Sequence, residues 1–168
     1  MRRIQTLLDI KEPEKCTDWI SQWNKPNDLS ILSYIRDVSS PVDFVAFSKI
    51  LFPDFIVREN AIFLALFLDE SDIAKIDLTK KDKSLVEKSY NIINIWDLFS
   101  GDIRGVEDRV YEDIGKIICI SWSMCLDRNF PDRKFIIKYE NSEKNYGPIV
   151  YFYQDPSWLN VDEAVLSR

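Results

Sequence analysis

The longest helical pattern in the chain covers residues 106–128 and reads VEDRVYEDIGKIICISWSMCLDR. Apolar side chains recur along it at the spacing that places them on one face of an α-helix. They are Val110, Ile114, Ile117, Ile118, Trp122 and Leu126. Between residues 114 and 126 the pattern is apolar nearly all round, and helices of that kind lie buried inside a fold. We therefore expect this segment to be the central helix.

One pair of β-rich segments precedes this helix and a second pair follows it. Residues 55–58 and 62–66 lie on either side of a short polar connection, and residues 135–139 and 149–153 flank a polar loop. β-Branched and aromatic runs joined in this way predict two hairpins. Residues 62–66 are apolar on both faces, which predicts a central, buried strand.

Helical patterns fill much of the first fifty residues. A clear helix start stands at Ser40, Pro41 and Asp43. Serine can cap a helix, proline suits the first helical position, and an acidic residue complements the positive helix end. The helix that begins there is expected to end at Pro53, because proline cannot continue it.

Two further helices are expected nearer the middle and the end of the chain. Residues 83–99 show helical spacing of apolar side chains, and Ser100-Gly101 would close that helix. Residues 155–168 are polar and are expected to form a short last helix after Pro156.

These patterns predict an α+β fold. We expect a single domain over residues 1–168, with a mostly antiparallel sheet of about four strands packed against about five helices. A chain of 168 residues is long enough to bury a substantial hydrophobic core. The side chains predicted to lie in that core are Ile93, Trp96, Ile117, Ile118, Trp122 and Phe152.

The charge balance of the chain bears on its partners. It has 22 Lys and Arg against 28 Asp and Glu, a formal net charge of −6, and no basic run longer than two residues. Phosphate backbones and anionic membranes repel such a chain, so we expect neither nucleic acid nor membrane as partner. A basic protein partner is electrostatically favoured. Plain solubility is the simpler explanation of the same charge.

The chain shows no targeting or membrane-spanning pattern. No apolar segment follows the basic start at Arg2 and Arg3, and the longest apolar run, residues 61–68, is too short to span a bilayer. The three cysteines show no CxxC spacing. We therefore expect a cytoplasmic protein with reduced thiols.

The absence of histidine narrows the chemistry. Without histidine, Ser-His-Asp and Cys-His sites and facial His/carboxylate metal sites are impossible. The acidic cluster at Glu107, Asp108, Glu112 and Asp113 is interleaved with Arg109, which is typical of an ion-paired surface. We expect no catalytic residues, no metal and no cofactor.

The tyrosines of the last hairpin are the candidate partner-binding residues. Strand alternation places Tyr151 and Tyr153 on one face, with the aliphatic and phenylalanine side chains on the other. We predict a binding surface formed by Tyr139, Tyr151 and Tyr153 and rimmed by Glu140, Glu143 and Asp155. The alternative is that helices cover this face and only the hydroxyl groups reach its rim.

Two resemblances bear on function. The segments 130–135 and 146–154 (FPDRKF and YGPIVYFYQ), together with IWDLF at 95–99, resemble parts of small uncharacterised bacterial proteins. In overall character (small, acidic, aromatic, without catalytic groups) the chain is similar to immunity proteins of bacterial toxin–immunity pairs. The resemblance implies a non-enzymatic, acidic protein-binding module that neutralises a cognate toxin. The alternatives are a carboxylate-based enzyme, a small-ligand-binding protein, or a homo-oligomer subunit that uses the tyrosine face.

Overall fold

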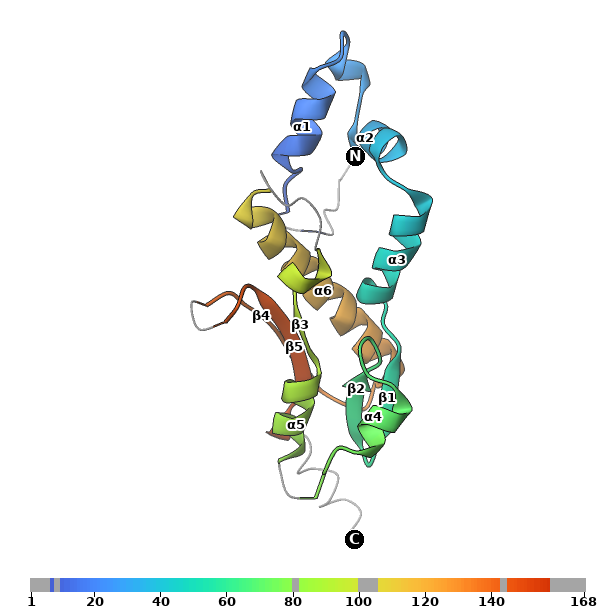
Figure 1. Cartoon of the computed structure of the whole chain (residues 1–168), viewed down its shortest axis with the longest axis vertical. Coiled ribbons are helices and arrows are strands. Elements are labelled where there is room, and N and C mark those ends of the chain that lie inside the picture. Colours follow the sequence, from blue (N-terminus) through green and yellow to red (C-terminus); the bar gives the residue numbers. More distant parts are fainter. Residues whose placement is uncertain (1–6, 8–9, 80–81, 100–105, 143–144, 158–168) are drawn as a thin grey trace.

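The computed structural model describes residue 7 and residues 10–79, 82–99, 106–142 and 145–157. In chain order these residues form α1 (Glu14–Ser21), the 3-10 helix η1 (Pro26–Asp28), α2 (Ile31–Val38), α3 (Pro41–Leu51), β1 (Phe55–Arg58), β2 (Ala61–Leu64), α4 (Glu70–Ala74), α5 (Lys83–Tyr90), β3 (Ile92–Asn94), the 3-10 helix η2 (Trp96–Leu98), α6 (Asp108–Asn129), β4 (Phe135–Glu140) and β5 (Ile149–Gln154). The molecule is elongated, with α1 and α2 at one end and α4 and α5 near the other (Figure 1).

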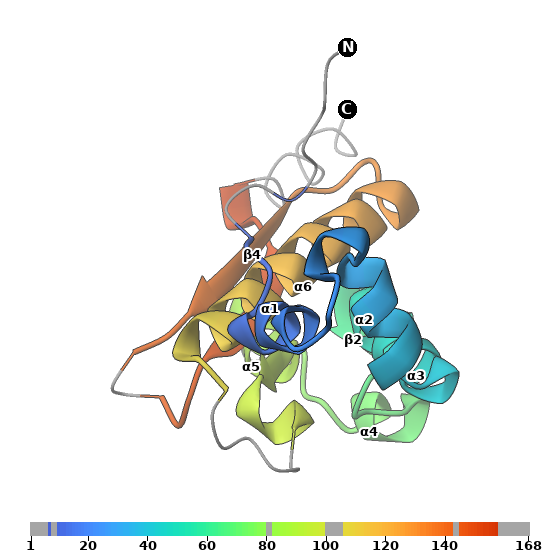
Figure 2. The same cartoon turned by 90° about the horizontal axis from the view of Figure 1, so that it is seen from above.

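Helix α6 packs on one face of a three-stranded antiparallel sheet with the strand order β3-β5-β4 (Figure 2). The ring of Phe152 on β5 lies 5.7 Å from that of Trp122 on α6, between ring centroids. Gly115 allows the close approach of helix and sheet, because a Cβ atom at this position would overlap the ring of Tyr139. The central helix and the second hairpin are both confirmed.

Strands β1 and β2 form the first predicted hairpin. Its two turn residues, Glu59 and Asn60, have φ angles of 50° and 67°. This left-handed backbone matches the twist of a tight hairpin, and asparagine tolerates it well. As predicted, β2 is buried along its whole length. The prediction that this strand is central is wrong: β2 is hydrogen-bonded to β1 only, so something other than a strand must complete its second edge.

Side chains from α5 and from the residue that follows it close the second edge of β2. The backbone N–H of Ile62 donates to Glu87 Oε1 (2.7 Å), and that of Leu64 donates to Asn91 Oδ1 (2.8 Å). Asn91 Nδ2 donates in turn to the carbonyl oxygen of Ile62 (2.8 Å). Glu87 Oε2 also accepts from the backbone N–H of Gln154 on β5 (2.7 Å). One buried carboxylate and one amide therefore replace a missing strand and join the two sheets.

The helix predicted over residues 83–99 is wrong beyond Tyr90. Helix α5 ends there, and Ile92–Asn94 pairs with β5 as β3. Asn91 gives the physical reason: its side chain is held by β2, and its carbonyl oxygen accepts from the N–H of Phe152 (3.2 Å). The fold class α+β is confirmed. Its finer description is corrected to five strands in two small antiparallel sheets, with six α-helices, among the described residues.

Four of the six side chains predicted to lie in the core are buried: Ile93, Ile118, Trp122 and Phe152. The prediction is wrong for the other two. Ile117 is half-buried, and Trp96 is 41% exposed. Because the chain leaves the helical path before residue 96, Trp96 packs against Tyr146 at the end of the sheet instead, with the ring centroids 5.7 Å apart.

The predicted helix start at Ser40 is confirmed. Ser40 Oγ accepts a hydrogen bond from the N–H of Val42 (3.1 Å), and α3 begins at Pro41. The short helix α4 was not predicted. Ser100, Gly101 and the tail beyond residue 157 lie outside the described residues, and with them the predicted closing turn and most of the predicted last helix.

Candidate protein-interaction surface

The three candidate tyrosines do not share a face of the sheet. In the β4–β5 register Tyr139 stands opposite Val150, and its ring lies against Gly115 of α6. Tyr151 points to the other face, beneath α5. Opposite residues in an antiparallel pair project to the same side, so Tyr139 belongs with the core face. The predicted grouping of Tyr139 with Tyr151 and Tyr153 is therefore wrong.

Tyr151 is buried rather than exposed. It is 1% exposed, and Lys88 Nζ of α5 lies 4.3 Å above its ring centroid. Its hydroxyl donates a hydrogen bond to the carboxylate of Glu140, and burial together with this bond raises the pKa of Tyr151 well above its usual range. Tyr153 is half-buried and stacks on Tyr151, with the ring centroids 6.2 Å apart. The structure therefore agrees with the alternative, in which a helix covers this face of the sheet.

The three acidic residues predicted to rim the surface do not lie together either. Glu140 accepts the hydrogen bond from Tyr151. The carboxylate of Asp155 accepts hydrogen bonds from the backbone N–H of Ser157 (2.9 Å) and from the hydroxyl of Ser157 (2.8 Å). The bond from the hydroxyl is the main cause of the lowered pKa of Asp155. Glu143 lies outside the described residues. The six predicted residues therefore do not form one exposed surface.

The buried carboxylate of Glu87 is used in the fold. In addition to its two backbone bonds, Oε1 accepts from Gln154 Nε2 (2.5 Å). Burial raises the pKa of Glu87 above its ordinary value, although the hydrogen bonds act in the opposite direction. Arg133 donates to the side chain of Gln154 (3.0 Å) and to the carbonyl oxygen of Asn60 (2.7 Å), which extends the network to the hairpin turn. Such a fully satisfied carboxylate acts as a structural link.

Three of the four carboxylates in the acidic cluster at the start of α6 are ion-paired, as the spacing predicts. Glu112 pairs with Lys116 at 2.7 Å, and Arg109 pairs with Asp113 at 3.4 Å and with Glu107 at 3.5 Å. Within the described residues no three His, Cys, Asp or Glu side chains are grouped as metal ligands would be. Burial raises the pKa of the Cys119 thiol to about 11, which keeps it protonated and unreactive at neutral pH.

Helix α3 leaves large apolar side chains in water. Val42 is 74% exposed, Phe44 75% and Val45 62%. A helix that is apolar nearly all round normally lies inside a protein, so its exposure indicates a surface that something else covers. The sequence PVDFVAFSKIL carries this signal, but the pattern alone does not say which side stays uncovered.

The C-terminal end of α3 is fixed firmly to α6. Trp122 Nε1 donates to the carbonyl oxygen of Ile50 (2.8 Å). The hydroxyl of Ser121 donates to the carbonyl oxygen of Leu51. The last carbonyl groups of a helix have no partner within it, so these bonds act as a cap supplied by another helix. The exposed residues of α3 are therefore presented on a well-positioned element.

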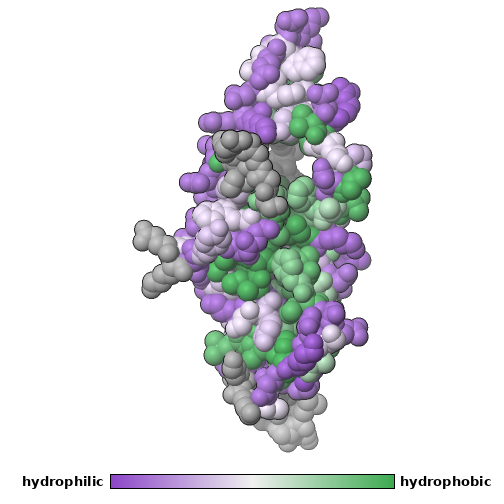
Figure 3. Space-filling model, in the orientation of Figure 1, coloured by the Kyte–Doolittle hydropathy of each residue, from purple (hydrophilic) through white to green (hydrophobic). Residues whose placement is uncertain are grey.

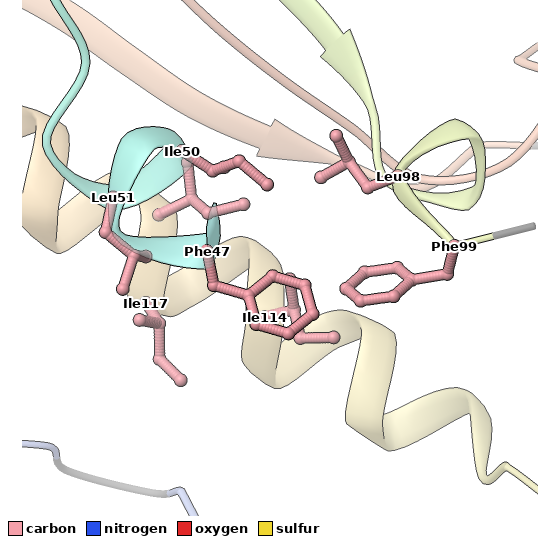
Figure 4. Close-up of a pocket in the computed structure, with 8 residues that line it drawn as sticks. Phe47, Ile50, Leu51, Leu98, Phe99, Ile114 and Ile117 are labelled. Atoms are coloured by element: carbon pink, nitrogen blue, oxygen red, sulfur yellow. The ribbon is translucent and has the colours of Figure 1, made fainter. Parts of the chain in front are cut away.

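A pocket opens between α3, α6 and the segment around η2 (Figure 4). Its volume is about 240 Å³. All of its lining residues are apolar: Phe47, Ile50, Leu51, Leu98, Phe99, Ile114, Ile117 and Ile118. The rings of Phe47 and Phe99 lie 5.8 Å apart, between centroids. We call this site the α3–α6 pocket.

Helix α2, which precedes α3 in the chain, also exposes apolar side chains. Leu32, Ile35 and Val38 are exposed on α2, which lies directly above α3 along the length of the molecule (Figure 1). We call Leu32, Ile35 and Val38 of α2 together with Val42, Phe44 and Val45 of α3 the α2–α3 surface. Apolar residues also gather along the middle of the face seen in Figure 3.

Comparisons with known proteins give no match: no family model, no curated protein and no solved structure is significantly similar to the chain. Among the described residues, no helix combines the length and the apolar character needed to cross a membrane.

Proposed function

We propose that this chain is a non-enzymatic, acidic protein-binding module of the immunity type, which neutralises a cognate bacterial toxin in the cytoplasm by covering part of its surface. The observation that carries the proposal is the exposure of α3. Three of its side chains, Val42, Phe44 and Val45, are more than half exposed on a helix whose end is anchored to α6. Apolar patches of this kind mark protein-binding sites.

The α3–α6 pocket supplies the second part of the proposal. Binding energy in protein interfaces is concentrated where a large side chain of one partner fills an apolar pocket of the other. The pocket holds about 240 Å³, and the exposed Phe47 lies at its edge. We expect an aromatic or aliphatic side chain of the toxin to fill it.

The net charge of −6 supports a basic partner. Complementary charge mainly raises the rate of association and suppresses wrong partners, whereas the affinity comes from the buried apolar contacts. We expect association to slow as salt is added, because salt screens exposed charges.

The proposal can be tested in cells. Each protein encoded beside the gene for this chain is expressed in a bacterial host with and without the chain, and growth is measured. We expect one of these proteins to arrest growth and the chain to restore it. Phe47→Asp should abolish the rescue, because it places a charge at the mouth of an apolar pocket.

Leu85→Asp is the matched control. Leu85 is 61% exposed on α5 and lies outside both the pocket and the α2–α3 surface, so this variant should still restore growth. Equal rescue by Phe47→Asp and the wild type would contradict the proposed surface. The absence of any growth-arresting neighbour would contradict the immunity function itself.

The same pocket favours a second candidate, a carrier of small apolar ligands. A buried apolar cavity of about 150 Å³ is enough to bind benzene, and this pocket is larger. A medium-chain fatty acid that raises the Tm of the wild type, but not of Phe47→Asp, would favour this function. No change in Tm with such ligands would exclude it.

A further inference from the structure

Asp43 lies on the side of α3 that lines the α3–α6 pocket. In a helix of about 3.6 residues per turn, Asp43 falls between Ile50 and Phe47 around the axis and stands one turn before Phe47. Phe47 and Ile50 both line the pocket. The other charged residue of α3, Lys49, points about 150° away from the pocket. Because Asp43 is exposed, its carboxylate stands at the edge of the pocket, in contact with water.

The opposite wall of the pocket, on α6, carries no charge. The residues of α6 that line it are isoleucines, and the same face continues with Val110 one turn before them and Ser121 one turn after them. Asp113 borders this face, but Arg109 pairs with it at 3.4 Å. Among the residues that the structure describes, Asp43 has no ion-pair partner. On the two helix faces that form the pocket, the charge of Asp43 is therefore not neutralised.

Asp43 also has a role in α3 itself. It lies in the first turn, where a carboxylate complements the positive end of the helix. That end is equivalent to about half a positive charge, against a full negative charge on the carboxylate. A net negative charge therefore remains beside the pocket. Because the apolar walls exclude water on one side, this charge acts more strongly on an occupant of the pocket than it would in open solvent.

We propose that Asp43 selects what enters the α3–α6 pocket, namely a partner segment in which a positively charged group stands directly beside the apolar side chain that fills the pocket. This inference rests on the proposed function and names the partner chemistry of the same site. The apolar side chain contacts Phe47 and Phe99, whose rings lie 5.8 Å apart between centroids (Figure 4). The cation lies about one helical turn, or about 5.4 Å, towards the start of α3 and pairs with Asp43.

Other occupants suit the site less well. A negatively charged group beside the anchor meets a like charge. A wholly apolar segment takes water away from Asp43 and gives the carboxylate no partner in return, which costs free energy. A basic side chain next to the anchor avoids both costs, because its aliphatic stem packs on the rim of the pocket while its charged end reaches the carboxylate.

Three probes with the same eight-carbon chain test the inference: octylammonium, octan-1-ol and octanoate. Each is titrated at about pH 7 into the isotope-labelled full chain, and the dissociation constant is taken from the NMR shifts of backbone amides around the pocket. At this pH the amine is positively charged and the carboxylic acid negatively charged. We expect octylammonium to bind about fivefold to tenfold more tightly than octanoate, with octan-1-ol between them.

Variants separate the effect of Asp43 from that of the net charge of −6, which attracts any cation. Asp43→Asn should remove the preference, so that octanoate binds at least as well as octylammonium, because only the positive helix end then acts on the head group. Asp43→Glu keeps the charge and should keep the preference. Asp132→Asn is the matched control. Asp132 is exposed in the turn before β4 and does not line the pocket, so this variant should change the preference by less than about twofold.

Equal binding of the three probes to the wild type would overturn the proposal. The same loss of preference in Asp132→Asn as in Asp43→Asn would overturn it too, and so would the absence of octylammonium binding at about 10 mM. The probes are measured without a toxin, so this failure and that of the proposed function are distinguishable. Failure of the growth rescue with the head-group preference intact would contradict the immunity function alone and would assign the pocket to small amphiphilic cations.

Discussion

The indole of Trp122 holds the end of α3 through a single hydrogen bond of 2.8 Å, from Nε1 to the carbonyl oxygen of Ile50. Trp122 is fully buried and also packs on Phe152 of the sheet. One side chain of the central helix therefore connects the hydrophobic core with the helix that carries the exposed apolar surface. The position of that surface depends on the core.

Trp122→Phe should weaken this connection. It removes the donor to Ile50 and leaves a small cavity, and we expect a loss of about 2–4 kcal/mol in the free energy of unfolding. Urea denaturation measures this loss. Trp23→Phe is the control, because Trp23 is largely exposed and should cost less than about 0.5 kcal/mol. Equal effects of the two variants would show that the hydrogen bond to Ile50 does not matter.

The buried Glu87 should make stability depend on pH. Its pKa in the folded chain is raised above the ordinary 4.5, mainly by burial. Between 4.5 and the raised value the folded state binds more protons than the unfolded state, so the contribution of Glu87 to stability falls as the pH rises through this window. Denaturation of the wild type and Glu87→Gln at several pH values measures the effect.

The difference in unfolding free energy between wild type and Glu87→Gln is the decisive quantity. It should move against the wild type as the pH rises above about 4.5. Asp69 and Asp155 have lowered pKa values and act in the opposite direction, but both are present in each protein and cancel in the difference. A difference that is constant with pH would show that Glu87 keeps its ordinary pKa.

Gly115 should resist substitution, because its missing side chain makes room for Tyr139. Gly115→Ala brings a methyl group into the Tyr139 ring. We expect a net loss of about 1–3 kcal/mol in unfolding free energy, although alanine favours a helix more than glycine does. Tyr139→Leu in the same chain should recover part of the loss. Stabilisation by Gly115→Ala alone would contradict the packing of α6 on β4.

The regular elements of this fold were predictable where the sequence pattern is strong. The period of residues 106–128 identified α6, and turn signals located both hairpins. The strand β3 was not predictable, because the side chain of Asn91 is held by β2, and this tertiary contact ends α5 earlier than the local pattern suggests.

The candidate site was likewise predictable from the sequence only in part. Alternation placed Tyr151 and Val150 correctly on opposite faces of β5. It did not show that α5 covers Tyr151, nor that the β4 register turns Tyr139 towards α6. The apolar character of α3 was visible in the sequence. Its exposure was not, because which face of a helix is covered depends on how the whole chain packs.

The proposed function requires that the chain binds a protein partner through α3 and the α3–α6 pocket. Its most direct test is the affinity of the purified chain for the growth-arresting neighbouring protein, measured by isothermal titration calorimetry. We predict that Phe47→Asp weakens binding by about 100-fold, as expected for a residue at the centre of an interface, while Leu85→Asp changes it by less than about threefold. Equal affinities for wild type and Phe47→Asp would show that the partner does not bind at the α3–α6 pocket.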